Sequence, residues 1–426
     1  MRSNYRPIGD YIRLVDERNS ELRVKNLLGL SISKEFIPSV ANIIGTDMEN
    51  YKIIKKGQFA CSLMQVRRDK KLPVALLNQF SEAILSPAYP VFEVINPSEL
   101  LPEYLMMWFS RSEFDREACF YSVGGVRGSL EWDDFCNMKL PVPSPEKQKE
   151  IVEEYHIIVN RMDLNQRMIQ KLEETAQAIY KQWFVDFEFP ISAELAQEMG
   201  NPVLEGKPYK SNGGEMVESE LGEIPMGWEV KPIKSFGNVI TGKTPSSDNP
   251  EDFGDFLPFV TPGDFSKYSK FAIGAERNLS EGGSKNLKNK ILKSGSVIVT
   301  CIGSDMGKVV LASSNCITNQ QMNSIVPTNS CKSDYLYYNL KSISEELKSI
   351  ALGGSTMPML SKTDFEKILI LKPLDNALQI FERIVTPINS RLLIHSKLTN
   401  SCIKIKNLLL SKIATIESQK LWDSKM

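Results

Sequence analysis

Two long stretches of heptad-spaced apolar residues constrain this chain more than any other feature of its sequence. In alternating steps of four and three, nine of ten positions from Ile151 to Trp183 are apolar, and eight of eleven from Phe381 to Ile416. Only 42% of the whole chain is hydrophobic. Such a seam is typical of a helix that packs along a partner helix. The sequence therefore predicts two long helices that pair with each other.

The polar exceptions in these seams suggest how the helices pair. Asn165 and His395 interrupt the seams near the middle of each helix, so an antiparallel pair would place them opposite each other. A polar pair in a helical seam lowers stability but can fix the register. Residues 145–188 carry six basic and nine acidic side chains, and residues 375–426 carry eight and four. The opposite net charges favour the same pairing, so we expect an antiparallel coiled coil.

A long-range repeat divides the rest of the chain. Residues 51–57 resemble 289–295, and residues 103–107 resemble 334–338, at shifts of 238 and 231 positions. The period is far longer than a solenoid repeat, so it indicates two duplicated domains. Short apolar runs alternate with short helical patterns in both copies, which predicts an α+β fold. The expected order is a globule at 1–144, a helix at 145–188, a linker at 189–225, a globule at 226–374 and a helix at 375–421.

The segment 189–225 differs in composition from its neighbours. It is rich in Pro, Gly and Glu and carries two basic and seven acidic residues. Such a composition is typical of a solvated connection, so we expect a linker here.

The overall composition narrows the class of protein. Lys and Arg total 51 against 52 for Asp and Glu, so no strong net field draws the chain to nucleic acid or membrane. The seven cysteines are scattered without a CxxC pair. The opening residues lack the apolar core of a signal peptide. The sequence also contains no run of 18 apolar residues, which is the length needed to cross a bilayer. We expect a cytoplasmic protein without disulfides.

Candidate chemistry is sparse. Gly237–Thr244 satisfies the GxxxxGK[ST] pattern of a phosphate-binding loop, which requires a buried strand before it and a helix after it. Pro245 follows at once, and Pro232 and Lys234 precede it, so we disfavour a nucleotide site. His156 and His395 are the only histidines, and both fall on the long helices, which argues against a histidine metal site. We predict a chain without catalytic residues, metal ligands or a cofactor of its own.

Basic and small polar residues in predicted loops are the best candidates for binding a polyanion. Residues 67–71 hold four positive charges within five positions, and Arg suits both phosphates and guanine edges. Residues 226–374 carry 17 basic and 14 acidic side chains, with lysines in Gly- and Ser-rich loops. A solvated charged surface is the alternative interpretation. The candidate contacts to nucleic acid are Arg67, Arg68, Lys70, Lys71, Arg127, Lys243, Thr244, Lys267, Ser304, Lys308, Ser355 and Thr356.

A second apolar stripe lies on the first helix. Tyr180, Phe184 and Phe187 are spaced i, i+4, i+7 and are offset from the seam that holds Trp183. One helix cannot cover both faces, so either a globule of this chain or another protein packs there. We take these four aromatic residues as candidate partner contacts.

Two unlike globules, each followed by a long helix, resemble the specificity subunit of Type I restriction–modification enzymes. The likeness covers nearly the whole chain. It rests on the order of several stretches, which are Met64–Lys71, Glu174–Phe187, Leu221–Val230, Thr241–Pro245, Phe259–Phe265 and Thr318–Met322.

The resemblance implies a function that spacing alone does not show. In this family each globule is a target-recognition domain that reads one half of a split double-stranded DNA site. The helices form an antiparallel coiled coil that docks two methylation subunits. Those subunits hold S-adenosylmethionine and methylate adenine, and separate restriction motor subunits use ATP and Mg. A P-loop NTPase and a coiled-coil scaffold without DNA specificity are the alternatives.

Overall fold

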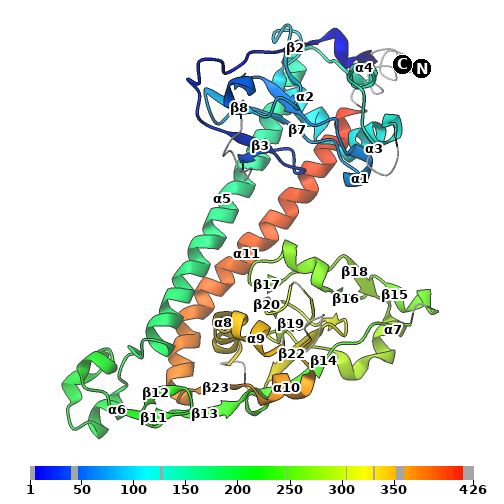
Figure 1. Cartoon of the computed structure of the whole chain (residues 1–426). Helices are drawn as coiled ribbons and strands as arrows, with labels where there is room; N and C mark the ends of the chain where they lie inside the picture. Colours follow the sequence, from blue (N-terminus) through cyan, green and yellow to red (C-terminus); the bar gives the residue numbers. More distant parts are fainter. Residues whose placement is uncertain are drawn as a thin grey trace. The chain divides into compact units, whose positions relative to one another are not determined.

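The computed structural model describes residues 5–39, 47–124, 128–246, 248–303, 305–329, 332–351 and 359–415. The chain divides into two compact units, one of Met1–Met162 with Ser401–Met426 and one of Asp163–Asn400. Each of the two long helices, α5 (Pro145–Phe184) and α11 (Asp375–Ile413), contributes one part to each unit (Figure 1).

The first unit is built on an antiparallel sheet of four strands in the order β2-β9-β6-β7. Phe59 and Phe92 stack across it with ring centroids 5.0 Å apart, and Phe109 packs edge-on against both. All three side chains are fully buried. Together with other apolar residues of the strands and short helices they form the core of this unit. The elements are β1 (Tyr5–Pro7), β2 (Ile12–Val15), β3 (Leu28–Leu30), β4 (Phe36–Pro38), β5 (Lys52–Lys55), β6 (Phe59–Cys61), α1 (Val66–Asp69), β7 (Val74–Leu76), β8 (Glu82–Leu85), β9 (Val91–Val94), α2 (Pro102–Phe109), α3 (Ser112–Tyr121), α4 (Trp132–Asn137) and β10 (Lys139–Pro141).

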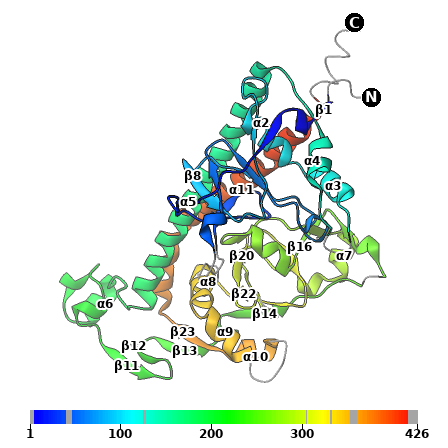
Figure 2. The same cartoon turned by 45° about the horizontal axis from the view of Figure 1, so that its top comes forward.

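The second unit holds a five-stranded sheet of order β14-β22-β19-β20-β17 and a four-stranded sheet of order β15-β18-β16-β21. Helix α8 lies against β19 and β20 (Figures 1 and 2). Together with the first unit, these elements give the expected α+β fold. They are β13 (Glu229–Pro232), β14 (Gly237–Thr241), β15 (Phe253–Gly254), β16 (Leu257–Val260), β17 (Phe271–Ala272), β18 (Arg277–Leu279), α7 (Glu281–Asn286), β19 (Val297–Thr300), β20 (Val309–Ala312), β21 (Ile317–Thr318), β22 (Met322–Pro327), α8 (Ser333–Ser342), α9 (Ser344–Ala351), α10 (Lys362–Lys367) and β23 (Leu369–Lys372).

Matching strands lie side by side in the same order in the sheets of the two units, which confirms the duplication. The order β2-β9-β6-β7 in the first unit corresponds to β14-β22-β19-β20 in the second. The turns correspond as well. Gly57 and Gly295 both have a positive φ, of 88° and 83°. Each donates its amide at 2.9 Å to a carbonyl at the end of the second strand that follows it, Leu77 directly after β7 and Ala312 in β20. Glycine tolerates this left-handed conformation, which explains why it recurs at both positions.

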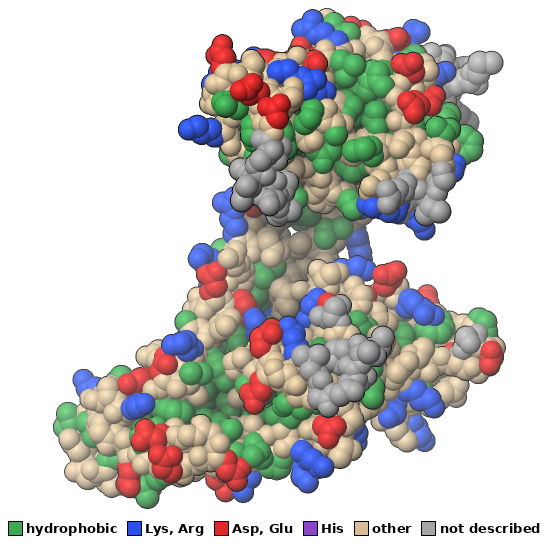
Figure 3. All heavy atoms as spheres, in the orientation of Figure 1, with side chains coloured by type: hydrophobic (Ala, Val, Ile, Leu, Met, Phe, Trp, Pro, Cys, Tyr) green, Lys and Arg blue, Asp and Glu red, His purple; other side chains and the backbone are tan. Residues whose placement is uncertain are grey.

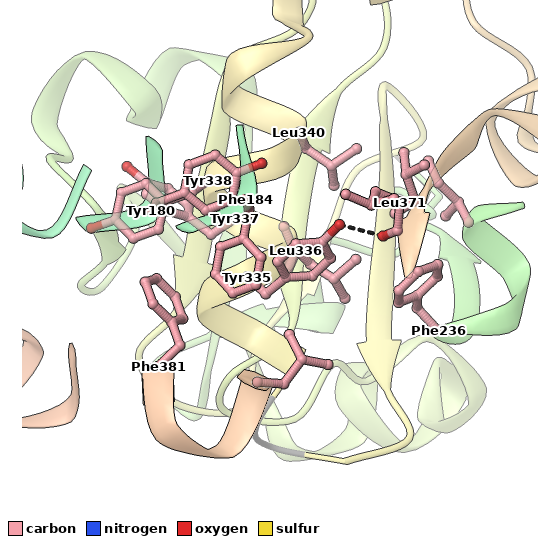
Figure 4. Close-up of a cluster of buried hydrophobic side chains, with 14 of the residues drawn as sticks. Tyr180, Phe184, Phe236, Tyr335, Leu336, Tyr337, Tyr338, Leu340, Leu371 and Phe381 are labelled. Atoms are coloured by element: carbon pink, nitrogen blue, oxygen red, sulfur yellow. Dashed lines mark hydrogen bonds between the residues drawn. The ribbon is translucent and has the colours of Figure 1, made fainter. Parts of the chain in front are cut away.

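The repeat extends to helices α2 and α8, which occupy the same place in the two units. Tyr104 of α2 donates its hydroxyl to the carbonyl of Pro141 at 3.2 Å, and Tyr335 of α8 donates to the carbonyl of Leu371 (Figure 4). Both tyrosines are fully buried. A buried hydroxyl needs such a partner, so the matched tyrosines fix the same helix against the same final strand in each copy.

The long helices pack antiparallel within each unit. In the second unit Trp183 lies 5.9 Å from Phe381 between ring centroids, and Asn165 Oδ1 lies 3.0 Å from His395 Nδ1. In the first unit Ile151 and Val152 share a core cluster with Leu410 and Ile413. The expected helices at 145–188 and 375–421 are therefore present, although α5 ends at Phe184. Residues 416–426 lie outside the described residues.

The Asn165–His395 pair is expected to contribute little net stability compared with an apolar pair at the same positions. Asn165 is fully buried, and its Nδ2 has no hydrogen-bond partner within the described chain, so the pair is only partly satisfied. We expect Asn165→Leu and His395→Leu each to lower the free energy of unfolding by about 1–3 kcal/mol, because each leaves a buried or half-buried polar group without its hydrogen-bond partner. The double substitution should recover most of that loss, because two leucines suit a helical seam. Urea unfolding of the four proteins measures the coupling, and additive losses would contradict it.

The segment between α5 and β13 differs from the solvated linker expected at 189–225. It contains α6 (Ala193–Glu198) and a hairpin of β11 (Met216–Ser219) and β12 (Gly222–Pro225). Phe189 stacks between Tyr209 and Trp228, at 4.7 and 4.9 Å between ring centroids. A few large aromatic residues thus form a small core. The average composition of the segment is polar, so it does not reveal this core. None of the described helices is long and apolar enough to cross a membrane.

Candidate nucleic-acid interface

The basic segment of the first unit lies on the loop that joins β6 to β7. Arg67, Arg68, Lys70 and Lys71 are all exposed, on or next to the single helical turn α1. Val66, between them and the core, is fully buried. Gln65 and Lys70, which bracket α1, have positive φ values of 63° and 52°. Non-glycine residues hold this strained conformation only where their surroundings enforce it, so the loop presents its charges in a fixed arrangement.

A second loop of the first unit packs against this basic loop. The Leu130 amide donates to the Leu63 carbonyl at 2.9 Å, and Arg67 Nη1 donates to the Gly124 carbonyl at 3.3 Å. A Cβ on Gly128 would lie 2.7 Å from the Arg67 Cβ, so only glycine permits this approach. Arg127, the remaining candidate of this unit, lies outside the described residues.

Arg68 is the one basic residue of this loop with an ion pair among the described residues. Its Nε and Nη2 donate to the carboxylate of the adjacent Asp69 at 2.7 and 3.1 Å. The Arg68 side chain is 50% exposed, and exposed pairs of this kind contribute only about 0–1 kcal/mol. A phosphate could therefore replace Asp69 at small cost, while Lys70 and Lys71 are available without such an exchange.

The second unit repeats this pair of loops. The loop that joins β19 to β20 corresponds to the basic loop, and the Leu360 amide donates to the Cys301 carbonyl at 2.9 Å, as Leu130 does to Leu63. Lys308 is exposed at the end of this loop and pairs with Asp305 at 2.6 Å. Ser304, Ser355 and Thr356 lie outside the described residues.

Three polar segments meet at another edge of the second unit. The Lys243 amide donates to the Thr318 carbonyl at 2.9 Å, and the Asn319 amide donates to the Val260 carbonyl at 3.2 Å. The Thr244 hydroxyl donates to Gln320 Oε1 at 2.5 Å. A Cβ on Gly242 would lie 2.1 Å from the Asn319 carbonyl oxygen, so the two segments touch through their backbones. Lys243 is exposed above this contact.

The sequence did not single out Thr261 or Asp264 at this edge. Asp264 accepts hydrogen bonds from both the amide and the hydroxyl of Thr261 at 2.9 Å, which closes the turn after β16. The sequence pointed to these two residues only through the Phe259–Phe265 stretch, which is part of the family resemblance. Asn319 and Gln320, from the Thr318–Met322 stretch, lie at the same edge and present amide groups, which pair well with adenine edges.

The phosphate-loop interpretation of Gly237–Thr244 does not hold. Gly237–Thr241 forms the extended strand β14, paired along its length with β22, so its backbone does not curl into a loop that could surround a phosphate. Among the described residues, the next helical turn after Thr244 begins only at Pro250 and spans three residues. The motif therefore lacks the helix N-terminus that its chemistry needs.

Lys267 and Lys308 line two neighbouring cavities of the second unit. Lys267 is exposed, pairs with Glu276 at 3.1 Å, and lines a small cavity with Tyr268 and Ser269. Lys308 lines a neighbouring cavity of about 300 Å³ that shares the same two residues. The structure thus brings Lys267 and Lys308 to cavities that share Tyr268 and Ser269, and it joins Lys243 and Thr244 to residues 318–320.

The aromatic stripe of α5 is a core rather than a free surface. Tyr180, Trp183 and Phe184 are 4–6% exposed, and Phe187 packs against Trp228 at 5.8 Å between ring centroids. Phe184 lies edge-on to both Tyr335 and Phe381 at 5.0 Å (Figure 4). Tyr180, Trp183 and Phe184 are therefore buried within this chain, against the second globule and α11, and their assignment as partner contacts is corrected, whereas Phe187 is half-buried.

Charge of both signs is spread over the surface. Figure 3 shows Lys and Arg side chains interspersed with Asp and Glu on the face that it presents. Among the described residues, no three or more His, Cys, Asp or Glu side chains gather as metal ligands would. The candidate interface is therefore a set of local basic and amide-bearing loops.

Comparison with known proteins gives a consistent result. A family model described as the Type I restriction modification DNA specificity domain matches residues 73–174 and 225–401. The chain is 28% identical to the Type I restriction enzyme HindI specificity subunit of Haemophilus influenzae, over 88% of this chain and 89% of that protein. It is 34% identical to the MjaIX specificity subunit of Methanocaldococcus jannaschii, over 49% of this chain and 46% of that protein. A crystal structure of the S subunit from M. genitalium shares the fold at a TM-score of 0.57 and 12% identity, covering 96% of this chain and 95% of that one.

Proposed function

Because this chain belongs to the Type I restriction–modification DNA specificity family, we propose that its globules, 1–144 and 226–374, each read one half of a split DNA target. The chain is a DNA specificity subunit. The division of the target between two globules is the proposal, and it rests on the repeated loops of the two units.

One observation carries this proposal. In both units the loop between the two matching strands is hydrogen-bonded at 2.9 Å to the loop before the last short helix, through Leu130 to Leu63 and through Leu360 to Cys301. Basic candidates lie on the first of these loops in each copy, Arg67–Lys71 and Lys308. A duplicated framework with unlike side chains on the same loops suits two readers of different base sequences.

The chemistry of these loops fits DNA. Lysines and arginines bind phosphates and so supply affinity that depends on salt. Arginine also reads guanine, and asparagine or glutamine reads adenine, in the major groove. Arg67, Lys243, Asn319 and Gln320 offer both kinds of group, so we propose them for contact with DNA together with the other described candidates.

The long helices would set the spacer between the half-sites and dock two methylation subunits. Several of their apolar side chains are exposed, among them Ile157 at 70% and Leu408 at 64%. Such exposure on helices is typical of surfaces that a partner covers. S-adenosylmethionine, ATP and Mg would then be bound by the methylation and restriction motor subunits, in the cytoplasm, and this chain would perform no catalysis of its own.

Mapping methylated adenines across the genome tests the function. We expect a split motif, two short fixed sequences around a spacer of constant length, to be methylated in cells with this gene and unmethylated after its deletion. Re-expression of the intact chain should restore the motif. A methylation map that is unchanged by deletion would refute the proposal, and a continuous motif would refute the division between two globules.

A further inference from the structure

A buried ion pair lies directly beneath the basic loop of the first unit. Lys34, on the turn between β3 and β4, pairs through Nζ with Asp115 Oδ1 of α3 at 2.8 Å. Their side chains are only 8% and 11% exposed. Lys34 also donates to the Phe109 carbonyl and lies over the Phe114 ring at 5.5 Å from its centroid.

Asp115 also binds the basic loop itself. The Leu72 amide, immediately after Lys71, donates to Asp115 Oδ1 at 3.0 Å, and Leu72 is fully buried. From the same helix, Cys119 donates its thiol to the Val66 carbonyl at 3.4 Å. Helix α3 thus holds the loop at both ends of its charged turn.

Backbone strain is concentrated in the two segments that Asp115 connects. Five described non-glycine residues have a positive φ, and three of them are Lys34, Gln65 and Lys70. Left-handed residues of this kind cost about 1–3 kcal/mol and persist where the surroundings enforce them. Strain is often found where a protein holds a binding loop in one conformation, and the buried carboxylate is the group that both segments share.

From this geometry we propose that Asp115 is a positioning residue for DNA reading. Its acceptor oxygen fixes the Leu72 amide and thereby the direction in which Arg67, Arg68, Lys70 and Lys71 face the first half-site. Lys34 neutralises the carboxylate so that it can remain buried. This inference rests on the proposed function, since it names what sets specificity in one of the two readers.

Two double variants isolate the hydrogen bond to Leu72. Lys34→Met with Asp115→Asn removes both charges but keeps a side-chain oxygen for the Leu72 amide. Lys34→Met with Asp115→Leu removes the charges and the oxygen while keeping the same number and branching of side-chain heavy atoms. Neither variant leaves a buried charge without its partner, so both are expected to fold. The matched control is Asn19→Ala, which removes a buried side chain that binds the Val24 amide and carbonyl elsewhere in this unit.

The measurement is the methylation rate of duplexes with single base changes, by each variant assembled with its methylation subunits. We expect the Asn double variant and Asn19→Ala to discriminate as the wild type does. The Leu double variant should lose about tenfold or more in discrimination at one half-site only, because a well-read base pair contributes about 1–3 kcal/mol.

Equal discrimination by the two double variants would overturn the inference, as would a loss spread over both half-sites. An equal loss in Asn19→Ala would also overturn it, because general destabilisation would then be the cause. Failure of the proposed function is recognised separately, since the wild-type complex would then show no split motif at all.

Discussion

Exchange of residues 10–144 for the corresponding globule of another specificity subunit is expected to replace one half of the methylated motif and to leave the other half unchanged. The largest core cluster of the first unit includes Ile151, Val152, Leu410 and Ile413 from the long helices. A new globule that packs on these four residues should fold without disturbing the second unit. The methylation map of cells that express the chimera reads the result directly.

The design of this exchange depends on Gln148, which is fully buried. Its Oε1 accepts the Leu101 amide at 2.8 Å, and its Nε2 donates to the carbonyls of Glu99 and Pro143 at 2.8 and 2.9 Å. The donor globule must offer the same backbone groups, because an unsatisfied buried amide costs about 1–3 kcal/mol. The reciprocal exchange of 226–374 is the control and should alter only the other half. Two altered halves from a single exchange would contradict separate readers.

The helices and the duplication were predictable because their signals are periodic or repeated. Heptad spacing places one face against a partner whatever the surrounding sequence, and Asn165 and His395 do meet in the second unit at 3.0 Å. The repeated Gly57 and Gly295 reflect a backbone conformation that few other residues accept. Such constraints act locally, so one sequence reveals them.

The errors came from features that depend on long-range packing. The stripe of Tyr180, Phe184 and Phe187 predicts an apolar neighbour but cannot identify it, and the neighbour is the second globule rather than another protein. The acidic, Gly-rich segment 189–225 folds because Phe189, Tyr209 and Trp228 meet across about forty positions of sequence. Average composition does not carry that information.

The candidate interface was predicted only in part. Exposed basic loops follow from composition, and the four charged residues at 67–71 are indeed exposed. The supporting groups, Asp115 and Lys34, are separated by 81 positions and have no motif. Their pairing arises from the fold, so it could not be read from the sequence.

Loss of the buried Lys270 ammonium is expected to destabilise the second unit by about 3–5 kcal/mol. Lys270 is fully buried and pairs through Nζ with Asp334 Oδ1 at 2.6 Å. It also donates to Asn389 Oδ1 at 2.8 Å and to the Tyr338 hydroxyl at 3.0 Å. Lys270→Met would leave the Asp334 carboxylate buried without a counter-charge. Urea unfolding at pH 7 measures the loss.

Glu382 gives this prediction a dependence on pH. Burial, and then the nearby Asp334 carboxylate, raise the pKa of Glu382 from 4.5 to about 8. The folded state therefore binds the Glu382 proton more tightly than the unfolded state, so stability from this group is greatest at acid pH and is lost as pH rises through about 8. The Lys270 charge offsets part of the repulsion between the two carboxylates, so the loss in Lys270→Met should be larger at pH 9 than at pH 6.

Two further variants separate charge pairing from general disruption. Lys270→Met with Asp334→Asn removes both charges and should recover at least half of the lost stability, because no buried carboxylate then lacks a cation. Lys267→Met is the matched control, since that lysine is 56% exposed in a pair with Glu276 and should change stability by less than about 0.5 kcal/mol. A loss below about 1 kcal/mol in Lys270→Met, or a double variant no more stable than the single one, would show that the buried pair does not hold this part of the fold together.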